Sequence, residues 1–339
     1  MKIKNKIISW LREWYPLLLI LSLALYFRIH LLLIRGTYWF DEMFSLHFAN
    51  LPWQEALKYW ALETNPPLYT LFLRFWSYFT NSSAEIIIRL PSIIFGITTI
   101  VLLYYFCLKA LNKKTAIVAS LSLALSGIHI FISSEARVYS LLALLTISSY
   151  FLFYQIFFNN KKSAYLWTSY FLINLLLIYS HLTALSIFLV QFLSLFLQRD
   201  NGKKIKKWFA GHISIALMWS VWFIPSFLSK INGESLGAWY FNPEVHQYAN
   251  ILTLLVSNFI NNNLTPFIFT TFGTILIVAL GFVVVKTKDE TNENKKRLLV
   301  FLQVWAYLLI FVGSIMGVFI TKFYIISSLS LYILIGYSV

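Results

Sequence analysis

Apolar runs of close to 20 residues recur along almost the whole chain, and they constrain its fold more than any other feature. A run of this length crosses the hydrocarbon core of a bilayer as an α-helix. With 59% hydrophobic and 12% charged residues, the chain is too apolar for a water-soluble domain, which is nearer about one quarter charged. We therefore predict an all-α polytopic membrane protein with ten spanning helices, at residues 16–34, 90–108, 115–133, 138–158, 163–180, 182–197, 208–228, 266–285, 298–320 and 323–339.

The basic residues indicate which way the helices run. With the N-terminus in the cytoplasm, the inside segments hold 19 of the 27 Lys and Arg residues, and these segments carry the whole net charge of +14. An excess of Lys and Arg in short cytoplasmic loops sets the orientation of membrane proteins. We predict a cytoplasmic N-terminus, contact with anionic lipid headgroups rather than nucleic acid, and a location in a bacterial-type inner (plasma) membrane.

Residues 1–339 are interpreted as one transmembrane domain with two long external segments, 35–89 and 229–265. The first contains residues 67–79, an aromatic amphipathic stretch that we expect to lie in the membrane interface. The fifth and sixth spans nearly join, which predicts a tight hairpin around His181. The lone Cys107 excludes an intrachain disulfide.

The adjacent carboxylates Asp41 and Glu42 are the sharpest candidates for chemistry on the outer side. Neighbouring side chains diverge by about 100° on a helix, so the two cannot aim at one atom. One would act on substrate, and the other would bind a metal or a basic partner. A solvated acidic pair at a helix start is the simpler alternative.

Five further external features lie on the same outer face, which we call the outer rim, and most of them have a structural alternative. Asn65 and the prolines after it also suit a helix start, and Arg89 also suits snorkelling. A short turn between two spans holds Glu135 and Arg137, which could simply pair with each other. His181 and Lys322 complete the set, and His181 alone would be an ordinary interfacial residue.

Four motifs stand in the order and spacing of a known group: Phe40-Asp41-Glu42, Asn65-Pro66-Pro67-Leu68-Tyr69, Arg89-Leu90-Pro91-Ser92 and Ser134-Glu135-Ala136-Arg137-Val138-Tyr139. The chain resembles the bacterial membrane glycosyltransferases related to protein O-mannosyltransferases and to the aminoarabinose transferase of lipid A, within the GT-C superfamily. The resemblance is strongest over residues 16–200. It implies a GT-C fold and an enzyme that takes a hexosyl or pentosyl unit from a polyprenyl-phosphate donor on the outer face.

The resemblance also implies roles for the external side chains. Asp41 matches the general base, and Glu42 completes the acidic pair. Residues that match the carrier-phosphate contacts are Arg89, Arg137, His181 and Lys322, and residues that match the supporting motif positions are Asn65, Tyr69, Glu135 and Tyr139. Lys322 replaces an Arg of the group, which keeps the charge but loses bidentate geometry. Many relatives have His where Asn65 stands.

The expected reaction needs one base and several cations. An acceptor hydroxyl on a glycan, lipid or protein attacks the anomeric carbon and gives up its proton to Asp41, and polyprenyl phosphate leaves as an anion. Direct displacement predicts inversion. A divalent metal, Mg²⁺ or Mn²⁺, would find hard oxygen ligands in Asp41, Glu42 and Glu135.

Three other functions compete with this one: a flippase or transporter of lipid-linked sugars, a non-catalytic assembly subunit, and a lipid-linked polymer ligase or polymerase. A transporter should line a midplane path with charges. Arg28 is the deepest external charge, about 9 Å from the end of its helix at 1.5 Å per residue, and it could snorkel. The sugar and acceptor stay open, and since most relatives continue past the tenth helix, we expect either a short member or a C-terminal part missing after Val339.

Overall fold

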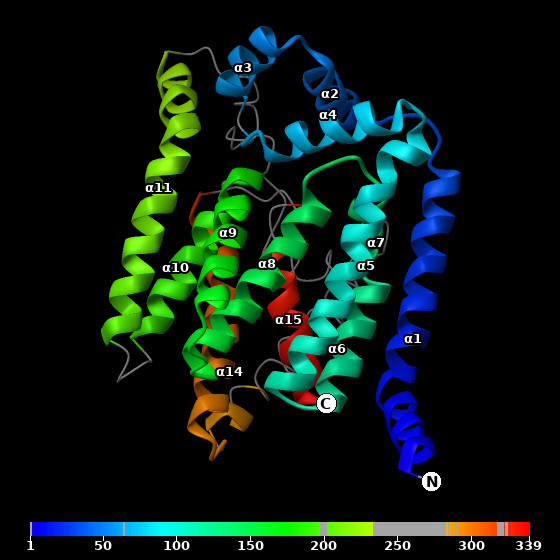
Figure 1. Cartoon of the computed structure of the whole chain (residues 1–339), viewed down its shortest axis with the longest axis vertical. Coiled ribbons are helices and arrows are strands. Elements are labelled where there is room, and N and C mark those ends of the chain that lie inside the picture. Colours follow the sequence, from blue (N-terminus) through cyan, green and yellow to red (C-terminus); the bar gives the residue numbers. More distant parts are fainter. Residues whose placement is uncertain are drawn as a thin grey trace.

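The chain forms a bundle of helices with a cap of three short helices at one end (Figure 1). The computed structural model describes residues 2–63, 65–196, 202–232, 283, 285–288, 290–316, 322 and 325–339, and no strand occurs among them. The bundle helices are α1 (Lys2–Ile34), α5 (Glu85–Ala110), α6 (Lys113–Leu125), α7 (Gly127–Ser133), α8 (Tyr139–Phe153), the π-helix η1 (Tyr154–Phe158), α9 (Ala164–Ser180), α10 (Ala184–Leu195), α11 (Gly202–Ile231), α14 (Glu293–Met316) and α15 (Ile325–Ser338). The cap helices are α2 (Phe40–Asn50), α3 (Trp53–Leu62) and α4 (Leu68–Thr80).

The prediction of an all-α polytopic membrane protein is confirmed. Four described helices are long and apolar enough to cross a membrane, or five if the bent pair α6 and α7 counts as one span. Helices α9, α10 and α15 are apolar but shorter. Nine of the predicted spans fall on described helices. The eighth predicted span, residues 266–285, and the external segment 229–265 lie almost entirely outside the described residues, so the count of ten is not confirmed.

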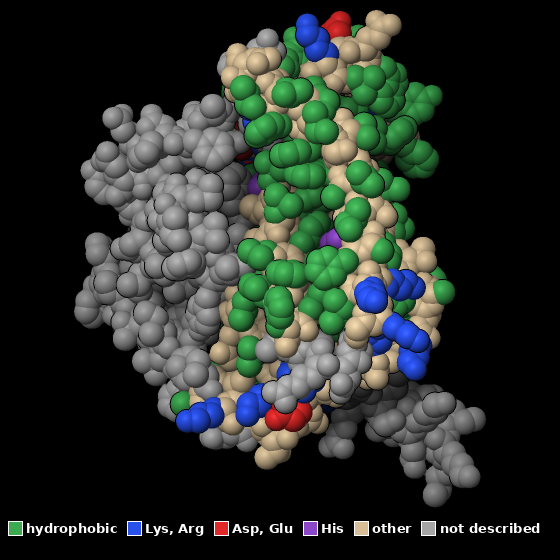
Figure 2. All heavy atoms as spheres, turned by 90° about the vertical axis from the view of Figure 1, so that its left-hand side faces the viewer, with side chains coloured by type: hydrophobic (Ala, Val, Ile, Leu, Met, Phe, Trp, Pro, Cys, Tyr) green, Lys and Arg blue, Asp and Glu red, His purple; other side chains and the backbone are tan. Residues whose placement is uncertain are grey.

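Charge and apolar surface are separated along the bundle. Figure 2 shows a face on which hydrophobic side chains cover the middle, while Lys and Arg gather towards the lower end. The first two turns of α11, which hold four lysines, begin at that end. Both termini lie there too, and the cap helices lie at the opposite end (Figure 1). That this end faces the cytoplasm stays a prediction of the positive-inside rule.

One of the cap helices, α4, forms where the aromatic interfacial segment was predicted. Helix α4 covers the stretch 67–79 and lies across the end of the bundle, with Tyr69 and Leu73 buried. Its other face leaves Tyr78 and Phe79 exposed. Helix α2 packs on α4, and α3 packs on α11. An amphipathic aromatic helix at one end of a membrane bundle is typical of a helix that lies in the bilayer interface.

One predicted span is broken in the middle. Residues 115–133 form α6 and α7, which meet at a bend of 62°. Ser126 stands at the break, and its hydroxyl accepts a hydrogen bond from the His129 backbone as the N-cap of α7. A Ser-Gly pair is a common place for such a kink. The break leaves the last carbonyls of α6 without helical partners.

Arg28 fills this break and does not snorkel. Its side chain is fully buried, and it donates to Ser133 Oγ at 3.2 Å, Ala124 O at 3.2 Å and Ala24 O at 3.3 Å. Ala124 belongs to the last turn of α6, so the cation satisfies a carbonyl that the kink exposes. The snorkelling interpretation of Arg28 was therefore wrong, because its guanidinium is buried and binds acceptors at the bend.

Gly96 of α5 allows this close packing, and replacing it with alanine should destabilise the protein. A Cβ at Gly96 would overlap Ser133 Oγ and would lie 3.4 Å from Arg28 Nε. Overpacking of this kind costs about 1–3 kcal/mol. Thermal unfolding of the purified protein in detergent measures the loss. Gly127→Ala is the matched control, since a Cβ there meets nothing within 4 Å. Equal unfolding temperatures for the two variants would show that this contact does not constrain the bundle.

Candidate functional site

The site begins at the first turn of α2, where the two adjacent carboxylates separate as predicted. Glu42 turns inward and is fully buried, while the Asp41 side chain stays 37% exposed. The Trp39 backbone N–H donates to Glu42 Oε2 at 3.0 Å, which closes the start of the helix. The Glu42 carboxylate is thus buried within the fold, and the Asp41 carboxylate remains partly exposed to solvent.

Glu42 binds a basic partner, and that partner is Arg89. Arg89 Nε donates to Oε1 at 2.9 Å and Nη2 donates to Oε2 at 2.8 Å, so the pair is bidentate. Ala136 N donates to Oε1 at 2.7 Å. Together with Trp39 N, these donors occupy all four acceptor positions of the carboxylate. Glu42 therefore joins α2, α5 and the turn between α7 and α8.

Arg89 also holds the loop that leads into α2. Its Nη1 donates to Gly36 O at 2.8 Å, and its Nη2 donates to Thr37 O at 3.0 Å. Gly36 has φ +68°, a left-handed conformation that glycine adopts without strain. Glu42 and Arg89 thus make their hydrogen bonds within the fold, which favours positioning roles for both. The catalytic role predicted for Glu42 and the phosphate contact predicted for Arg89 stay predictions.

Lys322 connects Asp41 to a second carboxylate. Its Nζ lies 3.8 Å from Asp41 Oδ2 and 3.1 Å from Glu135 Oε2. Glu135 is fully buried and also binds Arg35 Nη2 at 2.7 Å through Oε1. The predicted alternative of a local pair between Glu135 and Arg137 is therefore wrong. The short turn points these two side chains in different directions, and Arg35 reaches Glu135 from the end of α1.

Arg137 is held beside Asp41 by neutral acceptors. Its Nη1 donates to the Asp41 backbone carbonyl at 3.1 Å and to Ser45 Oγ at 2.6 Å. Its Nε is buried and has no partner within the described part of the chain. The carboxylates of Asp41, Glu63 and Glu135 all act on the Arg137 charge. The buried Nε donor of Arg137 is the group in this cluster that suits an anion.

His181 lies in the turn between α9 and α10, which confirms the predicted hairpin. Its Nδ1 accepts from Thr183 N at 3.2 Å, so in the neutral ring the proton sits on Nε2. Burial, and secondarily the Arg137 charge, lower the pKa of His181 to about 3. The imidazole is therefore neutral at pH 7 and offers a hydrogen-bond donor rather than a charge.

The aromatic and amide residues of the motifs pack against the charged side chains of the site or hydrogen-bond near them. Tyr139 lies under Lys322, with Nζ 5.5 Å from the ring centroid, and its ring packs against His181. Tyr69 is buried with its hydroxyl 3.3 Å from Ser92 Oγ. Asn65 is not a helix cap, since Pro67 occupies that position of α4. Its side chain instead donates to Glu63 Oε1 at 3.1 Å.

The carboxylates do not form the metal site that the sequence suggested. Among the described residues, no three His, Cys, Asp or Glu side chains are grouped as metal ligands. The oxygens of Glu42 already accept four hydrogen bonds, and Glu135 is shared by two cations. The set of Asp41, Glu42 and Glu135 therefore does not fit a Mg²⁺ or Mn²⁺ ion, and we assign it no metal.

Sequence reasoning missed two residues of this site, Arg35 and Ser45. Arg35 binds Glu135, and the Ser45 hydroxyl orients Arg137. Ser45 follows Asp41 by four residues and thus lies on the same face of α2. That spacing was the available signal for Ser45, whereas nothing in the sequence points to Arg35 beyond its position at the outer end of α1.

Comparison with known proteins bears on the fold. No protein-family model matches the sequence, and no curated protein matches it. Among solved structures, the chain is similar to the crystal structure of ArnT from Cupriavidus metallidurans bound to undecaprenyl phosphate, with a TM-score of 0.66 and 16% sequence identity. The match covers 95% of this chain and 59% of ArnT. The chain thus shares the membrane fold of ArnT, and the predicted GT-C fold is confirmed.

Proposed function

We propose that this chain is an inverting glycosyltransferase that moves a sugar from a polyprenyl-phosphate donor to a hydroxyl acceptor on the extracytoplasmic side of the membrane. The observation that carries the proposal is the partly exposed Asp41 carboxylate, which lies 3.8 Å from the Lys322 ammonium, with Arg137 bound to the Asp41 backbone carbonyl. The fold supports it, because the structure of ArnT with this fold was solved with undecaprenyl phosphate bound. The chain spans 59% of ArnT, so substrate and activity here rest on the site itself.

Asp41 is the proposed general base. Its side chain is the open carboxylate of the cluster, and the Lys322 ammonium is its nearest charged partner among the described residues, at 3.8 Å. The acceptor hydroxyl passes its proton to an Asp41 oxygen as the hydroxyl oxygen attacks the anomeric carbon. Glu42 cannot take this role, since its oxygens are occupied.

Arg137 and Lys322 are the proposed contacts of the carrier phosphate. The bond between the anomeric carbon and the phosphate oxygen breaks with its electron pair on that oxygen, so negative charge grows there. Preorganised cations and donors stabilise such charge without reorganising. His181 adds a neutral N–H donor at the same rim. Because the phosphate leaves as a stable anion, no general acid is required, and a single displacement inverts the anomeric centre.

The direct test is sugar transfer by the purified protein in lipid nanodiscs. The donor is a radiolabelled undecaprenyl-phosphate sugar and the acceptor is an extract of cell-envelope glycans and lipids. We expect labelled product with inverted anomeric configuration. Movement of the carrier across proteoliposomes without product would favour the transporter. Neither transfer nor movement would favour the assembly subunit, and growth of a polymer would favour the polymerase.

Replacing Arg137 with glutamine should slow the chemical step. The variant keeps a polar side chain near Ser45 but removes the charge and the buried Nε donor. Loss of one such donor to the developing anion lowers kcat by about 10²-fold or more. Single-turnover kinetics at saturating donor measure the effect. Lys58→Gln, on the exposed face of α3, is the control. An unchanged rate in the Arg137 variant would remove this residue from the phosphate site.

A further inference from the structure

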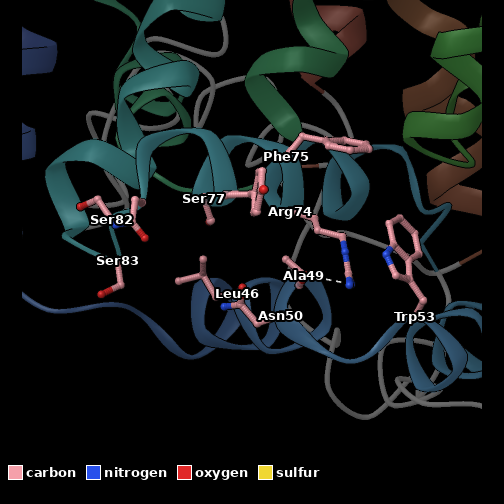
Figure 3. Close-up of a pocket in the computed structure, with 11 residues that line it drawn as sticks. Leu46, Ala49, Asn50, Trp53, Arg74, Phe75, Ser77, Ser82 and Ser83 are labelled. Atoms are coloured by element: carbon pink, nitrogen blue, oxygen red, sulfur yellow. Dashed lines mark hydrogen bonds between the residues drawn. The ribbon is translucent and has the colours of Figure 1, made fainter.

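A hollow separate from Asp41 lies between the cap helices. We name it the α2–α4 groove. Its volume is about 710 Å³, and its walls include Asn50, Trp53, Arg74, Phe75, Ser77 and Tyr78 (Figure 3). It lies at the same end of the bundle as Asp41, and Leu46 of α2 also lines it. Leu46 follows Asp41 by five residues, about 7.5 Å along the helix axis at 1.5 Å per residue.

Arg74 gives the groove a positive charge. Its Nη1 donates to Leu51 O at 2.7 Å and to Ala49 O at 3.2 Å, and its Cζ lies 4.0 Å from the centroid of the Trp53 ring. These contacts hold the guanidinium in one place (Figure 3). No acidic residue lines the groove, and no carboxylate pairs with Arg74 within the described residues. A fixed and uncompensated guanidinium suits a carboxylate or a phosphate.

The other walls suit a sugar ring rather than an acyl chain. Trp53, Phe75 and Tyr78 offer ring faces, and all three are about half exposed or more. Small polar groups lie between them, among them the Asn50 amide and Ser77, whose buried Oγ has no partner in the described part of the chain. Binding sites combine apolar ring faces with a few polar groups that fix orientation. A pyranose presents both an apolar C–H face and hydroxyl groups.

We propose that the α2–α4 groove binds an acidic carbohydrate, with its carboxylate or phosphate on Arg74 and its sugar ring against Trp53 and Tyr78. The role of this site rests on the proposed function. The groove would hold the acceptor next to the reacting groups and would select acceptors that carry an acidic group. Asp41 and the groove lie on different faces of α2, so the groove contacts a part of the acceptor away from the reacting hydroxyl.

Ligand binding can be measured without sugar transfer. The full-length protein in zwitterionic nanodiscs is titrated with glucose 1-phosphate, glucose and inorganic phosphate, and bound ligand is followed by saturation-transfer NMR or by competition. We expect glucose 1-phosphate to bind more tightly than either fragment. Arg74→Gln should weaken its binding about tenfold or more, because a charge-assisted pair is lost. Equal affinity for inorganic phosphate would reduce the groove to an anion site and overturn the proposal.

Two neighbouring residues provide a matched pair of variants that avoids the structural role of Arg74. Tyr78 and Phe79 are both strongly exposed on α4, at 87% and 84%, but only Tyr78 lines the α2–α4 groove. Tyr78→Ala should weaken glucose 1-phosphate binding about fivefold, the value of one lost aromatic contact. Phe79→Ala should leave it unchanged. Equal effects of the two variants would contradict the proposal.

Two further measurements separate this site from a lipid site and from the proposed donor site. In nanodiscs with phosphatidylglycerol, sugar binding should persist. Its complete displacement by the anionic lipid would assign the groove to a lipid headgroup and overturn the carbohydrate. Arg137→Gln, which removes a proposed contact of the donor phosphate, should retain glucose 1-phosphate binding. If the protein transfers no sugar but still binds glucose 1-phosphate through Arg74 and Tyr78, the proposed function fails while the groove stands.

Discussion

Replacing Asp41 with asparagine should abolish sugar transfer and leave the fold unchanged. The variant keeps the size of the side chain but cannot accept the proton of the acceptor hydroxyl. A positioned base contributes about 10²- to 10⁴-fold to the rate. The fold should tolerate the change because Asp41 binds Arg137 and Ser45 through its backbone carbonyl, which asparagine retains. The measurement is the single-turnover rate with a radiolabelled undecaprenyl-phosphate sugar, with the thermal unfolding temperature measured in parallel.

Two comparisons make this result specific to Asp41. Glu55→Gln removes an exposed carboxylate from α3, in the same external segment, and should leave the rate unchanged. Donor binding by the Asp41→Asn variant should persist, since Arg137 and Lys322 remain in place. A variant that transfers sugar at the normal rate would exclude Asp41 as the base. A variant that fails to bind donor would instead assign Asp41 to the organisation of Lys322.

The periodic and compositional features of the chain predicted the fold well. Nine of the predicted apolar runs fall on described helices, four or five of which are long and apolar enough to span a membrane, and the aromatic stretch 67–79 predicted α4. The break between α6 and α7 was not predicted, because the 115–133 run stays apolar through Ser126-Gly127. A kink depends on how freed carbonyls are satisfied, and here the donor is Arg28, which is about 100 residues away in the sequence.

The sequence predicted which residues form the candidate site but not how they pair. Motifs identified Asp41, Glu42, Arg89, Glu135 and Arg137, and the structure brings all five together. Their division into partners was not predictable, because a sequence gives no distances between residues on different helices. Glu42 pairs with Arg89, and Glu135 pairs with Arg35 and Lys322. These pairings separate the side chains that hold the rim together from those left to act on a substrate.

Breaking the pair of Glu42 and Arg89 should destabilise the protein more than breaking the neighbouring pair of Glu135 and Arg35. Arg89→Met leaves the Glu42 carboxylate buried with only backbone donors, and an uncompensated buried charge costs about 3–5 kcal/mol. Arg35→Met should cost less, because Lys322 still compensates Glu135 and because the Arg35 side chain is 12% exposed. Thermal unfolding in detergent compares the two variants. A larger loss in the Arg35 variant would contradict this order.

The loss of stability of the protein on acidification should depend on the Glu42 carboxylate. Burial alone would raise the pKa of Glu42, but hydrogen bonds from Arg89, Ala136 N and Trp39 N outweigh burial and lower the pKa below its ordinary value. A lowered pKa in the folded state contributes stability above the unfolded pKa, near about 4.3, and that stability is lost as the pH falls through the folded value. The wild type should therefore lose stability on acidification below about pH 4, and Glu42→Gln should lose less over the same interval. Parallel curves for the two proteins would show that the carboxylate is not charged in the fold. Since Glu42 anchors both α2 and the turn that carries Arg137, acid should disrupt the proposed site before it unfolds the apolar bundle.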